Sequence, residues 1–326
     1  MANSLTVLER QSPEKLRNDF RQDVLHGLSA NPKRIPSRHF YDAVGSRIFQ
    51  EIMDMPEYYL TDCEREILQK HSPEIVAAVD RPFRMIELGA GDGRKTRILL
   101  EELQKQGRDF EYTPLDISES AVAGLLEDVS ADYPKIPMRG LVCEYNHGLE
   151  YLCHADRRNL VLFLGSSIGN FSLDEASAFF GRLRAMLNPG DLCLVGFDLV
   201  KDPAVLQRAY DDAAGITRRF NLNLLSRINN ELGGHFDLDG FQHYASYDAG
   251  RSTMESYLLS RRRQSVRIEA LGHDFDFGAW EAVHVEFSWK YSEGDIAMLA
   301  ERNNFRLKRV YTDDRDYFAV SLFEAV

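Results

Sequence analysis

The chain has 326 residues, of which 44% are hydrophobic and 28% are charged, and its net charge is −12. This composition is typical of a globular protein and argues against long disordered tails. The negative charge argues against nucleic acid as a partner, because binding to phosphates relies on lysine and arginine. A small-molecule or protein partner is favoured, and the length favours one large α/β domain with a sizeable elaboration.

The sequence shows no sign of export or membrane insertion. The N-terminus MANSLTVLERQS lacks the basic start and long apolar run of a signal peptide. No apolar run reaches the ~18 residues of a membrane helix. The four cysteines form no CxxC pair, and Cys143 and Cys193 lie in apolar runs typical of core strands. We therefore expect a soluble cytoplasmic protein with reduced thiols, acting as a monomer.

Short apolar runs alternate with helical periodicity between residue 84 and about residue 200. The expected strands are 84–89, 110–117, 138–145, 159–165 and 191–199. The clearest expected helices are 94–106 and 173–187, and Asn188-Pro189-Gly190 ends the second. This alternation predicts parallel βαβ units in a doubly wound sheet.

The pattern changes after residue 200. One long helix is expected over 203–232, ended by Gly233-Gly234, and then an antiparallel sheet formed by the runs FQHYASYD, TMESYLLSRR, QSVRIEAL and AVHVEFSWKY. A helix and two strands after residue 292 would complete the first sheet as an antiparallel hairpin. We therefore predict one domain of residues 61–200 plus 292–326, and a second of 1–60, mostly helical, plus 201–291.

The segment MIELGAGDGRKT joins a predicted strand to a predicted helix through Gly89, Gly91 and Gly93. Glycine lets a backbone turn sharply and approach a ligand with no Cβ in the way. A dinucleotide-binding loop requires GxGxxG, and Arg94 stands at its last position here. The spacing GxGxG after Glu87 is instead similar to the loop of class I S-adenosylmethionine (SAM) methyltransferases.

Polar residues follow other predicted strands of the same sheet. Asp116 ends the second strand, where a carboxylate can accept both ribose hydroxyls or cap the next helix. Glu144 and Tyr145 end the third strand, where an acid can meet an adenine amino group or lie in an exposed loop. The fourth strand runs into the small and polar residues 165–170. We expect this backbone to pass close to a small ligand, with Asn170 facing it.

Agreement with one known family extends over almost the whole chain, in the blocks FYDAVGS (40–46), PEYYLT (56–61), FLGSSIGNF (163–171), DLVKD (198–202), AYDDAAGIT (209–217), FNLNLLSRINNELGGHFDLDGF (220–241) and VEFSWKY (285–291). These blocks resemble the SAM-dependent histidine Nα-methyltransferases of ergothioneine biosynthesis. The resemblance implies a Rossmann-like class I methyltransferase sheet, a second substrate-binding α+β domain, and SAM as the cofactor.

The resemblance also implies roles for individual side chains. Tyr41 and Tyr210 match tyrosines that hold the substrate carboxylate, and phenol donors bind a carboxylate without adding positive charge beside the amine. Tyr58 and Asn170 match residues around the reacting α-amino group and are the expected catalytic residues. Gly165 is expected to line the same substrate site. The expected cofactor contacts are Glu87, Gly89, Gly91, Lys95, Asp116, Glu144 and Tyr145.

Glu286 and Ser288 match the pair that binds the imidazole ring in this family. A buried carboxylate suits a ligand that donates an N–H, and leaving it unpaired would cost about 1–3 kcal/mol. From the residues alone, Val285 and Phe287 alternate with Glu286, so this side chain would be expected to face water. The resemblance instead favours a role in the site.

Two positions depart from the family pattern. The glycine loop reads ELGAGDGRKT where the family usually has ELGSGTSEKT, which leaves Gly89, Gly91 and Lys95 in place. Ser256 lies where bacterial members carry a methionine beside the substrate ring, and a smaller polar residue can enlarge or wet the pocket. The substrate is therefore open between histidine and another aromatic amino acid or related small amine, such as tryptophan.

The sequence thus predicts three methyl transfers from SAM to the α-nitrogen of L-histidine, giving hercynine. A nicotinamide oxidoreductase is disfavoured by Arg94. A non-enzymatic scaffold is disfavoured because Tyr41, Asn170, Tyr210 and Glu286 occur together. No metal site is expected, because the nine histidines are scattered and form neither HxH nor HExxH.

Overall fold

The computed structural model describes residues 4–8, 12–80, 82–153 and 157–326. The chain divides into two compact units, which are described separately. Unit 1 comprises Met1–Arg10, Asp62–Val200 and Tyr291–Val326, and unit 2 comprises Gln11–Thr61 and Lys201–Lys290. The expected assignment of one domain to SAM and the other to the amino acid stays a prediction.

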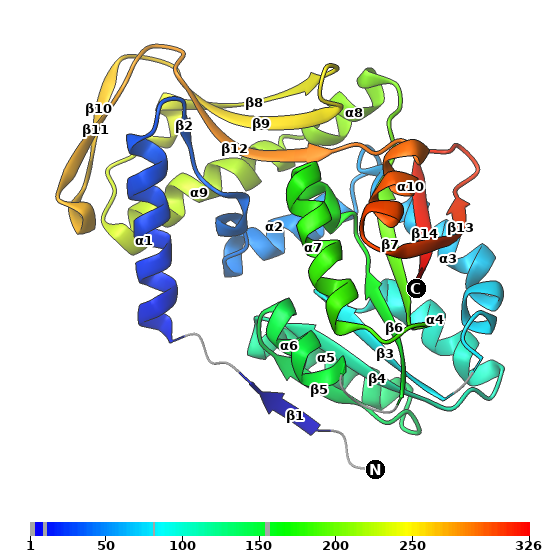
Figure 1. Ribbon diagram of the computed structural model, residues 1–326. Coiled ribbons are helices and arrows are strands. Elements are labelled where there is room, and N and C mark those ends of the chain that lie inside the picture. The colour runs from blue at the N-terminus through cyan, green and yellow to red at the C-terminus, as the bar shows by residue number, and fades with distance from the viewer. Residues whose placement is uncertain (1–3, 9–11, 81, 154–156) are drawn as a thin grey trace. The chain divides into compact units, whose positions relative to one another are not determined.

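Unit 1 is built on an eight-stranded sheet of order β1-β5-β4-β3-β6-β7-β14-β13 (Figure 1). Its strands are β1 (Ser4–Val7), β3 (Phe83–Leu88), β4 (Phe110–Asp116), β5 (Arg139–Val142), β6 (Arg158–Phe163), β7 (Leu192–Asp198), β13 (Phe305–Thr312) and β14 (Phe318–Ala325). Strands β1 to β7 of this sheet pair in parallel, and β14 is antiparallel to β7 and β13. The predicted Rossmann-like sheet and its C-terminal hairpin are confirmed, whereas β1 was not expected.

Helices precede or connect the strands of the large sheet in unit 1. They are α3 (Tyr59–Ala77, entering from unit 2), α4 (Arg94–Lys105), α5 (Glu119–Asp132), α6 (Tyr145–Cys153), α7 (Leu173–Met186) and α10 (Glu293–Arg302), with a 3-10 turn η2 (Ser167–Asn170). Figure 1 shows α7 and α10 in front of β6, β7 and β14, and α7 packs against both α6 and α10. The expected helices 94–106 and 173–187 are confirmed as α4 and α7.

The central strands of this sheet are buried along their whole length. Every residue of β3 and of β7 is buried, as expected for parallel strands covered on both faces. Cys143 and Cys193 are both buried, which confirms their expected place in the core. Because the parallel strands are buried, polar chemistry is confined to the loops at their ends.

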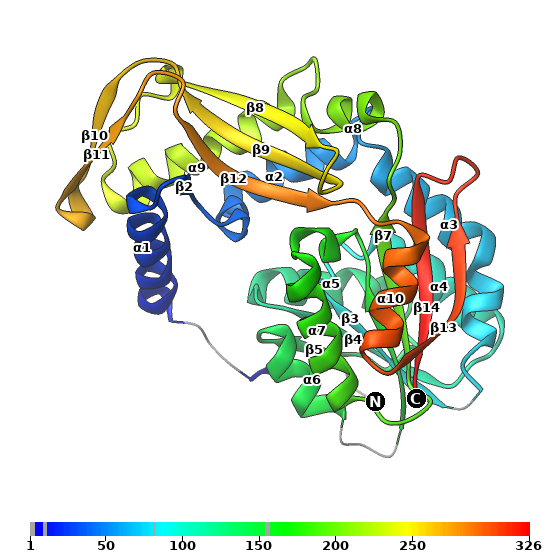
Figure 2. The same cartoon turned by 45° about the horizontal axis from the view of Figure 1, so that its top comes forward.

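Unit 2 contains a four-stranded sheet of order β2-β12-β9-β8 (Figure 2). Its strands are β2 (Lys33–Arg34), β8 (Phe241–Asp248), β9 (Thr253–Ser260) and β12 (Ala282–Trp289). Pairing is antiparallel from β12 through β9 to β8, and β2 joins β12 in parallel. The run QSVRIEAL does not join this sheet as expected. It forms β10 (Gln264–Ile268), which pairs with β11 (His273–Phe277) in a separate two-stranded ribbon.

The helices of unit 2 are α1 (Pro13–Ser29), α2 (Ala43–Met53), α8 (Pro203–Tyr210) and α9 (Ile216–Leu232), with short turns η1 (Ser37–Phe40), η3 (Leu238–Gly240) and η4 (Glu269–Leu271). The prediction of one helix over 203–232 is wrong. Asp212 accepts hydrogen bonds from the backbone N–H groups of Ile216 at 2.9 Å and Thr217 at 2.7 Å. This carboxylate satisfies the first turn of α9, and Gly215 supplies a φ of +74° before it.

An apolar core holds unit 2 together beneath the sheet. Helix α9 packs against β8 and β9, and α2 packs against α9. Phe40 and Phe220 pack with tilted rings, 4.8 Å between centroids, and Phe241 and Phe277 pack edge to face at 5.4 Å. Helix α9 thus packs its apolar side chains against the sheet. The same face of the sheet also carries the polar residues of β12 that are described below.

Asp313 organises the turn between β13 and β14. Its buried carboxylate accepts hydrogen bonds from the backbone N–H groups of Arg315, Tyr317 and Phe318 at 3.1, 2.8 and 2.7 Å. We expect Asp313→Ala to lower the free energy of unfolding by about 2–4 kcal/mol, because several buried N–H groups lose their acceptor. Urea unfolding measures the change, and Asp314→Ala, an exposed neighbour, is the control that should leave the midpoint nearly unchanged. Equal midpoints for the two variants would contradict this account.

Candidate functional site

The loop after β3 has a backbone conformation that allows a ligand to approach its main chain closely. Gly89, Gly91 and Gly93 have φ angles of +71°, +54° and +67°, a region that residues with a Cβ rarely adopt. A Cβ on Gly89 would lie 2.7 Å from Tyr145 Oη, and one on Gly93 would lie 2.5 Å from Leu125 Cδ1. The glycines are therefore required both by the turn and by the side chains above it.

Tyr145 and Asp116 lie beside this loop, at the ends of neighbouring strands. Tyr145 is half-buried at the start of α6, and burial, followed by the nearby Asp116 charge, raises the pKa of its phenol to about 12. Asp116 Oδ1 accepts the backbone N–H of Ser118 at 3.0 Å, while Ser118 itself caps α5. Burial raises the pKa of Asp116. Glu144 is exposed. The structure thus brings Gly89, Asp116 and Tyr145 together.

Glu87 lies under the loop and is engaged by the chain itself. Its carboxylate accepts hydrogen bonds from Thr96 Oγ1 and Tyr112 Oη. Burial raises the pKa of Glu87 to about 7, and the two hydrogen bonds act in the opposite direction. Glu87 therefore ties β3 to α4 and β4 from inside, and a direct cofactor contact stays a prediction.

Glu64, which the sequence analysis missed, connects the glycine loop to the turn after β6. Its buried carboxylate accepts the backbone N–H of Gly165 at 2.9 and 3.0 Å, one distance for each oxygen. Lys95 Nζ donates to Glu64 Oε2 at 2.5 Å. Gly196 leaves room for this carboxylate, because a Cβ there would collide with Oε1. Glu64 therefore fixes Lys95 and Gly165, two of the predicted site residues, with respect to each other.

The turn after β6 contains two successive residues in the left-handed backbone region. Gly165 and Ser166 have φ angles of +78° and +56°. Ser166 Oγ accepts the backbone N–H of Asp198 at 3.0 Å, and Tyr291 Oη donates to Ile168 O at 3.2 Å. These bonds hold the turn, and Asn170 at its end is exposed. A role for Asn170 at a reacting amine stays a prediction.

In unit 2, strand β12 contains one residue more than its partner β9. His284 pairs with Tyr257 and Glu286 pairs with Ser256, so that Val285 is the extra residue of a β-bulge. A bulge re-aims the side chains that follow it. Glu286 therefore lies opposite the buried Ser256, and the expectation from alternation alone, that Glu286 faces water, is wrong.

The carboxyl of Glu286 lies in an environment that disfavours its charge. Burial raises its pKa to about 7, and the Lys290 charge and a hydrogen bond from Ser256 act in the opposite direction. That hydrogen bond is long, with Ser256 Oγ 3.4 Å from Glu286 Oε2. The residue still keeps part of its surface open to solvent. A partly accessible carboxyl with a raised pKa and only a weak internal donor is suited to accept a hydrogen bond from a ligand.

Ser288 and Tyr210 meet at a buried lysine, two residues further along the chain from Ser288. Lys290 Nζ donates to Tyr210 Oη at 2.8 Å and to Ser288 Oγ at 2.9 Å, and Tyr210 Oη donates to Ser288 Oγ at 2.8 Å. The ammonium lies 4.6 Å from the centroid of the Tyr210 ring. The structure therefore brings together Tyr210 and Ser288, and adds Lys290, which the sequence analysis missed.

The remaining predicted tyrosines share an aromatic cluster in unit 2. Tyr41 packs edge to face against Phe49 and Phe220, with centroids 5.4 and 5.7 Å apart. Tyr58 packs edge to face against the same Phe49 at 6.2 Å. Tyr41 remains exposed, whereas Tyr58 is half-buried. These contacts place both tyrosines around Phe49, and their contact with a substrate stays a prediction.

The two missed residues differ in how visible they are in the sequence. Lys290 continues the two-residue spacing of Glu286 and Ser288, and that period along a strand is a signal for a shared face. Glu64 in the helical stretch CEREI has the appearance of an ordinary surface acid. Only the close approach of α3 to the Gly165 turn reveals its role.

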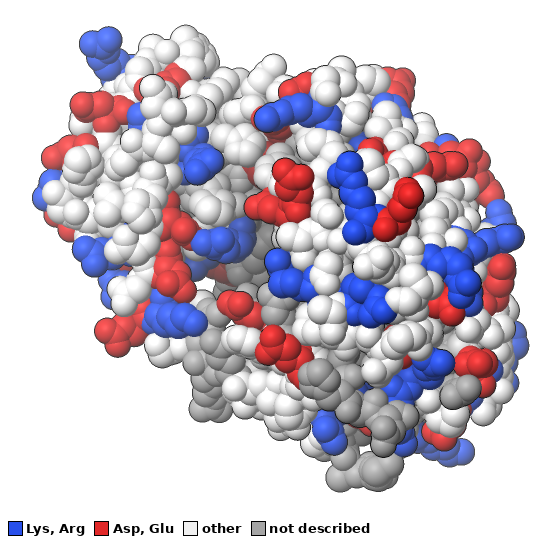
Figure 3. Space-filling view, viewed as in Figure 1, with Lys and Arg blue, Asp and Glu red and all other residues white. Residues whose placement is uncertain are grey.

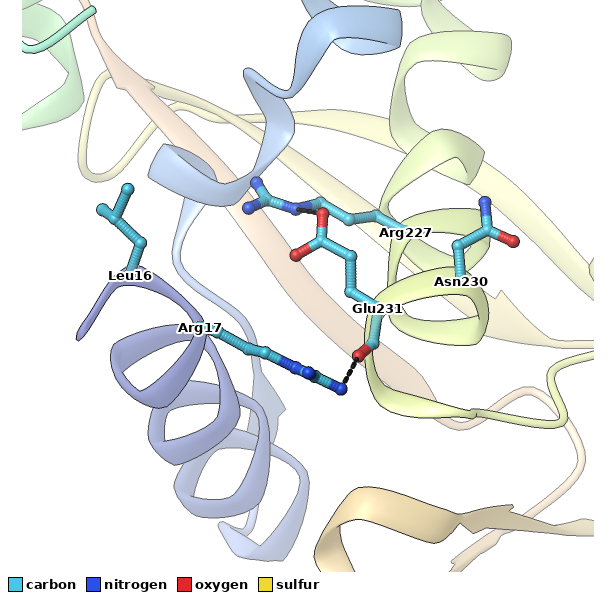
Figure 4. A pocket seen from close by; sticks show the side chains of 5 residues that line it. All are labelled: Leu16, Arg17, Arg227, Asn230 and Glu231. Atoms are coloured by element: carbon cyan, nitrogen blue, oxygen red, sulfur yellow. Dashed lines mark hydrogen bonds and ion pairs between the residues drawn. The ribbon is translucent and has the colours of Figure 1, made fainter. Parts of the chain in front are cut away.

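Acidic and basic residues lie close to one another on the face described next. On the face shown in Figure 3, basic and acidic side chains are interspersed. A hollow of about 460 Å³ in unit 2 is lined by Leu16, Arg17, Arg227, Asn230 and Glu231 (Figure 4). There Arg227 Nε donates to Glu231 Oε1 at 2.8 Å and Arg17 donates to the Glu231 carbonyl at 3.0 Å. None of the predicted site residues lines this hollow.

Within the described ranges, no helix has the length and apolar character needed to cross a membrane. The same part of the chain contains no group of three or more histidine, cysteine or acidic side chains placed to hold a metal ion.

Comparison with known proteins gives one consistent family. A family model described as "Histidine-specific methyltransferase, SAM-dependent" matches residues 20–325. The chain is 40% identical to the histidine N-alpha-methyltransferase of Mycolicibacterium smegmatis, over 98% of this chain and 99% of that protein. It is 38% identical to the protein of the same name from Mycobacterium tuberculosis, over 93% of this chain and 94% of that protein.

A longer relative is also similar. The chain is 31% identical to ergothioneine biosynthesis protein 1 of Schizosaccharomyces pombe, over 85% of this chain and 37% of that protein. The family model and the two mycobacterial relatives each cover nearly all of the chain, including both units. The protein therefore belongs to the family of histidine-specific, SAM-dependent methyltransferases.

Proposed function

We propose that this protein transfers methyl groups from SAM to the α-nitrogen of L-histidine, three times in succession, and so makes hercynine for ergothioneine biosynthesis. Family membership supports the reaction class. The choice of histidine as the substrate is supported by the position of Glu286. The bulge turns this carboxyl inward, opposite Ser256 and on the same face as Ser288. A carboxyl held there favours a substrate that donates a ring N–H. A cytoplasmic monomer stays a prediction.

The residues of unit 1 fit SAM as the cofactor. The left-handed glycines leave a cradle without Cβ atoms, and Asp116 and Tyr145 border it. Asp116, with its raised pKa, is suited to accept ribose hydroxyl groups, and Lys95 to bind a carboxylate. When bound, SAM supplies a methyl group on a positively charged sulfur, which makes that carbon electrophilic. Glu87, Gly91 and Glu144 are the other residues that we assign to this site.

On the substrate side, the chain must hold histidine at both ends while its nitrogen stays free to rotate between methylations. Glu286 and Ser288 would bind the ring, Tyr41 and Tyr210 the carboxylate, and Tyr58 and Asn170 would orient the neutral amine. Tyr210 donates to Ser288 in this structure, so a bond to the substrate carboxylate requires its hydrogen to turn. We assign no side chain as the base, and the amine proton would leave through water.

A second substrate class is favoured by one observation. Ser256, opposite Glu286, is a small buried residue, and it leaves more space beside a ring than a larger apolar side chain would. Tryptophan or a related aromatic amine is therefore the alternative substrate. Calorimetric titration with histidine and with tryptophan separates the two proposals.

Incubation with SAM and a mixture of amino acids tests the proposed reaction. We expect mass spectrometry to show histidine with one, two and then three added methyl groups, and the other amino acids unchanged. Methylation of tryptophan without methylation of histidine would instead establish the alternative. The absence of any methylated amino acid would overturn both.

Replacement of Glu286 tests the ring contact. We expect Glu286→Ala to weaken histidine binding by about 10- to 100-fold, because the ring N–H loses its acceptor, while tryptophan binding is kept or improved. Asp276→Ala removes an exposed acid from β11 of the same unit and should leave both affinities unchanged. Equal losses for histidine and tryptophan in Glu286→Ala would refute the assignment.

The raised pKa of Glu286 predicts proton release on binding. The folded protein holds the proton of Glu286 up to a pKa of about 7, above the ordinary value of the unfolded chain. Protonation of Glu286 therefore stabilises the folded state fully below the unfolded pKa, and this stabilisation is lost as the pH rises through 7. A ring N–H stabilises the carboxylate, so histidine binding near pH 7 should expel part of a proton. Calorimetry in two buffers of different ionisation enthalpy measures this release, which Glu286→Gln should reduce. The same release in both proteins would show that Glu286 is not its source.

A further inference from the structure

The bulge in β12 places a row of polar side chains on the inward face of its sheet. Glu286, Ser288 and Lys290 are spaced by two residues, and therefore project to the same side beyond Val285. Ser288 and Lys290 are both buried, and Lys290 is 0% exposed. A fully buried lysine is rare unless it is paired, and Lys290 donates hydrogen bonds here to the hydroxyl groups of Tyr210 and Ser288.

The arrangement fixes what Ser288 can offer to a ligand. A serine oxygen has two lone pairs and one hydrogen, whereas an ammonium group has only hydrogens to give. Ser288 Oγ accepts from Lys290 at 2.9 Å and from Tyr210 at 2.8 Å. Both lone pairs are therefore directed at these two side chains, and the second still faces the Tyr210 oxygen when Tyr210 turns its hydrogen to the substrate carboxylate. The hydrogen of Ser288 is the group left for a ligand.

Glu286 offers the opposite property. An ionised carboxylate only accepts hydrogen bonds, and its one described internal donor is the distant Ser256 hydroxyl at 3.4 Å. Two side chains on the same face thus present one hydrogen and one acceptor. A neutral imidazole presents the complementary pair, one ring nitrogen with a lone pair and one with a hydrogen. An imidazolium lacks the lone pair, an indole has only the N–H, and a phenyl ring has neither.

We propose that Lys290 is a positioning residue that makes Ser288 a hydrogen-bond donor, so that Ser288 and Glu286 together select the neutral imidazole of the substrate. This inference rests on the proposed function, since it concerns how that amino acid is recognised. Lys290 sets the hydrogen-bonding role of Ser288 by donating to it, and its charge also acts on Glu286. Its loss would let Ser288 turn its hydrogen away and offer a lone pair instead.

Histidine analogues separate the two contacts. The 4-thiazolyl and 5-thiazolyl isomers of alanine keep a ring lone pair at one or the other position and have no N–H, and phenylalanine has neither. The preference for the better thiazolyl isomer over phenylalanine reports the Ser288 contact. The preference for histidine over that isomer reports the Glu286 contact. Binding of each amino acid is measured by calorimetry in the presence of S-adenosylhomocysteine.

We expect the wild-type protein to prefer thiazolylalanine over phenylalanine by roughly five- to tenfold, the effect of one hydrogen bond. Lys290→Met should reduce this ratio to near one, whereas the ratio of histidine to thiazolylalanine should fall less, because Glu286 stays in place and loses only the nearby Lys290 charge. Ser288→Ala should reduce the first ratio equally, and the double variant should lose no more than either single one. Lys33→Met removes another lysine of unit 2, paired with Glu281 at 2.5 Å, and should change neither ratio.

Separate control measurements distinguish a loss of folding from a loss of ring recognition. A melting curve and the affinity for S-adenosylhomocysteine, which the residues of unit 1 are proposed to bind, show whether Lys290→Met is folded. If it is not, Lys290→Gln, which keeps a donating amide, is expected to retain part of the preference. An unchanged thiazolylalanine preference in a folded Lys290 variant would overturn this inference alone. A wild-type protein that binds histidine no better than phenylalanine would overturn the proposed function.

Discussion

The proposed amino-acid site depends on a single extra residue in one strand. A strand presents alternate side chains to alternate faces, so inserting Val285 exchanges the faces for every residue after it. Without this bulge, the sheet face that packs against α9 would receive Phe287 and Trp289, and Glu286 would be outside. With it, one strand is apolar where it covers the core and polar where it reaches a ligand site. The local cost is an unpaired residue in the ladder.

The break between α8 and α9 is the second requirement. Because Asp212 caps α9, α8 ends at Tyr210 and its last carbonyl is released from the helix. His243 Nε2 lies 2.9 Å from that carbonyl, and burial lowers the pKa of this histidine, which favours its neutral form. Tyr210 is thus held from both ends, through its carbonyl by β8 and through its hydroxyl by Lys290. The polar groups are in position before any ligand arrives, which reduces the entropy lost on binding.

Most of the sheet in unit 1 was predictable from the sequence, because buried parallel strands such as β3 and β7 are uninterrupted apolar runs. The glycine loop was predictable because its conformation demands glycine. The face of Glu286 was not, since a bulge leaves no clear mark in an alternating pattern. The break at Asp212 was missed because its flanks are both strongly helical. Glu64 was missed because its partners are over 30 positions away in the chain, and only tertiary contact identifies them.

The outermost strand of the large sheet carries one further consequence. Among the strands that the structure describes, β13 pairs with β14 alone, and Arg306, Lys308 and Arg309 are exposed along it. Arg306 and Lys308 are balanced within the molecule by Glu324, at 2.6 and 3.2 Å. A foreign strand adding to this border would have to bury these cations without new counter-charges. The border is thereby protected against fibre growth, although its backbone is available for pairing.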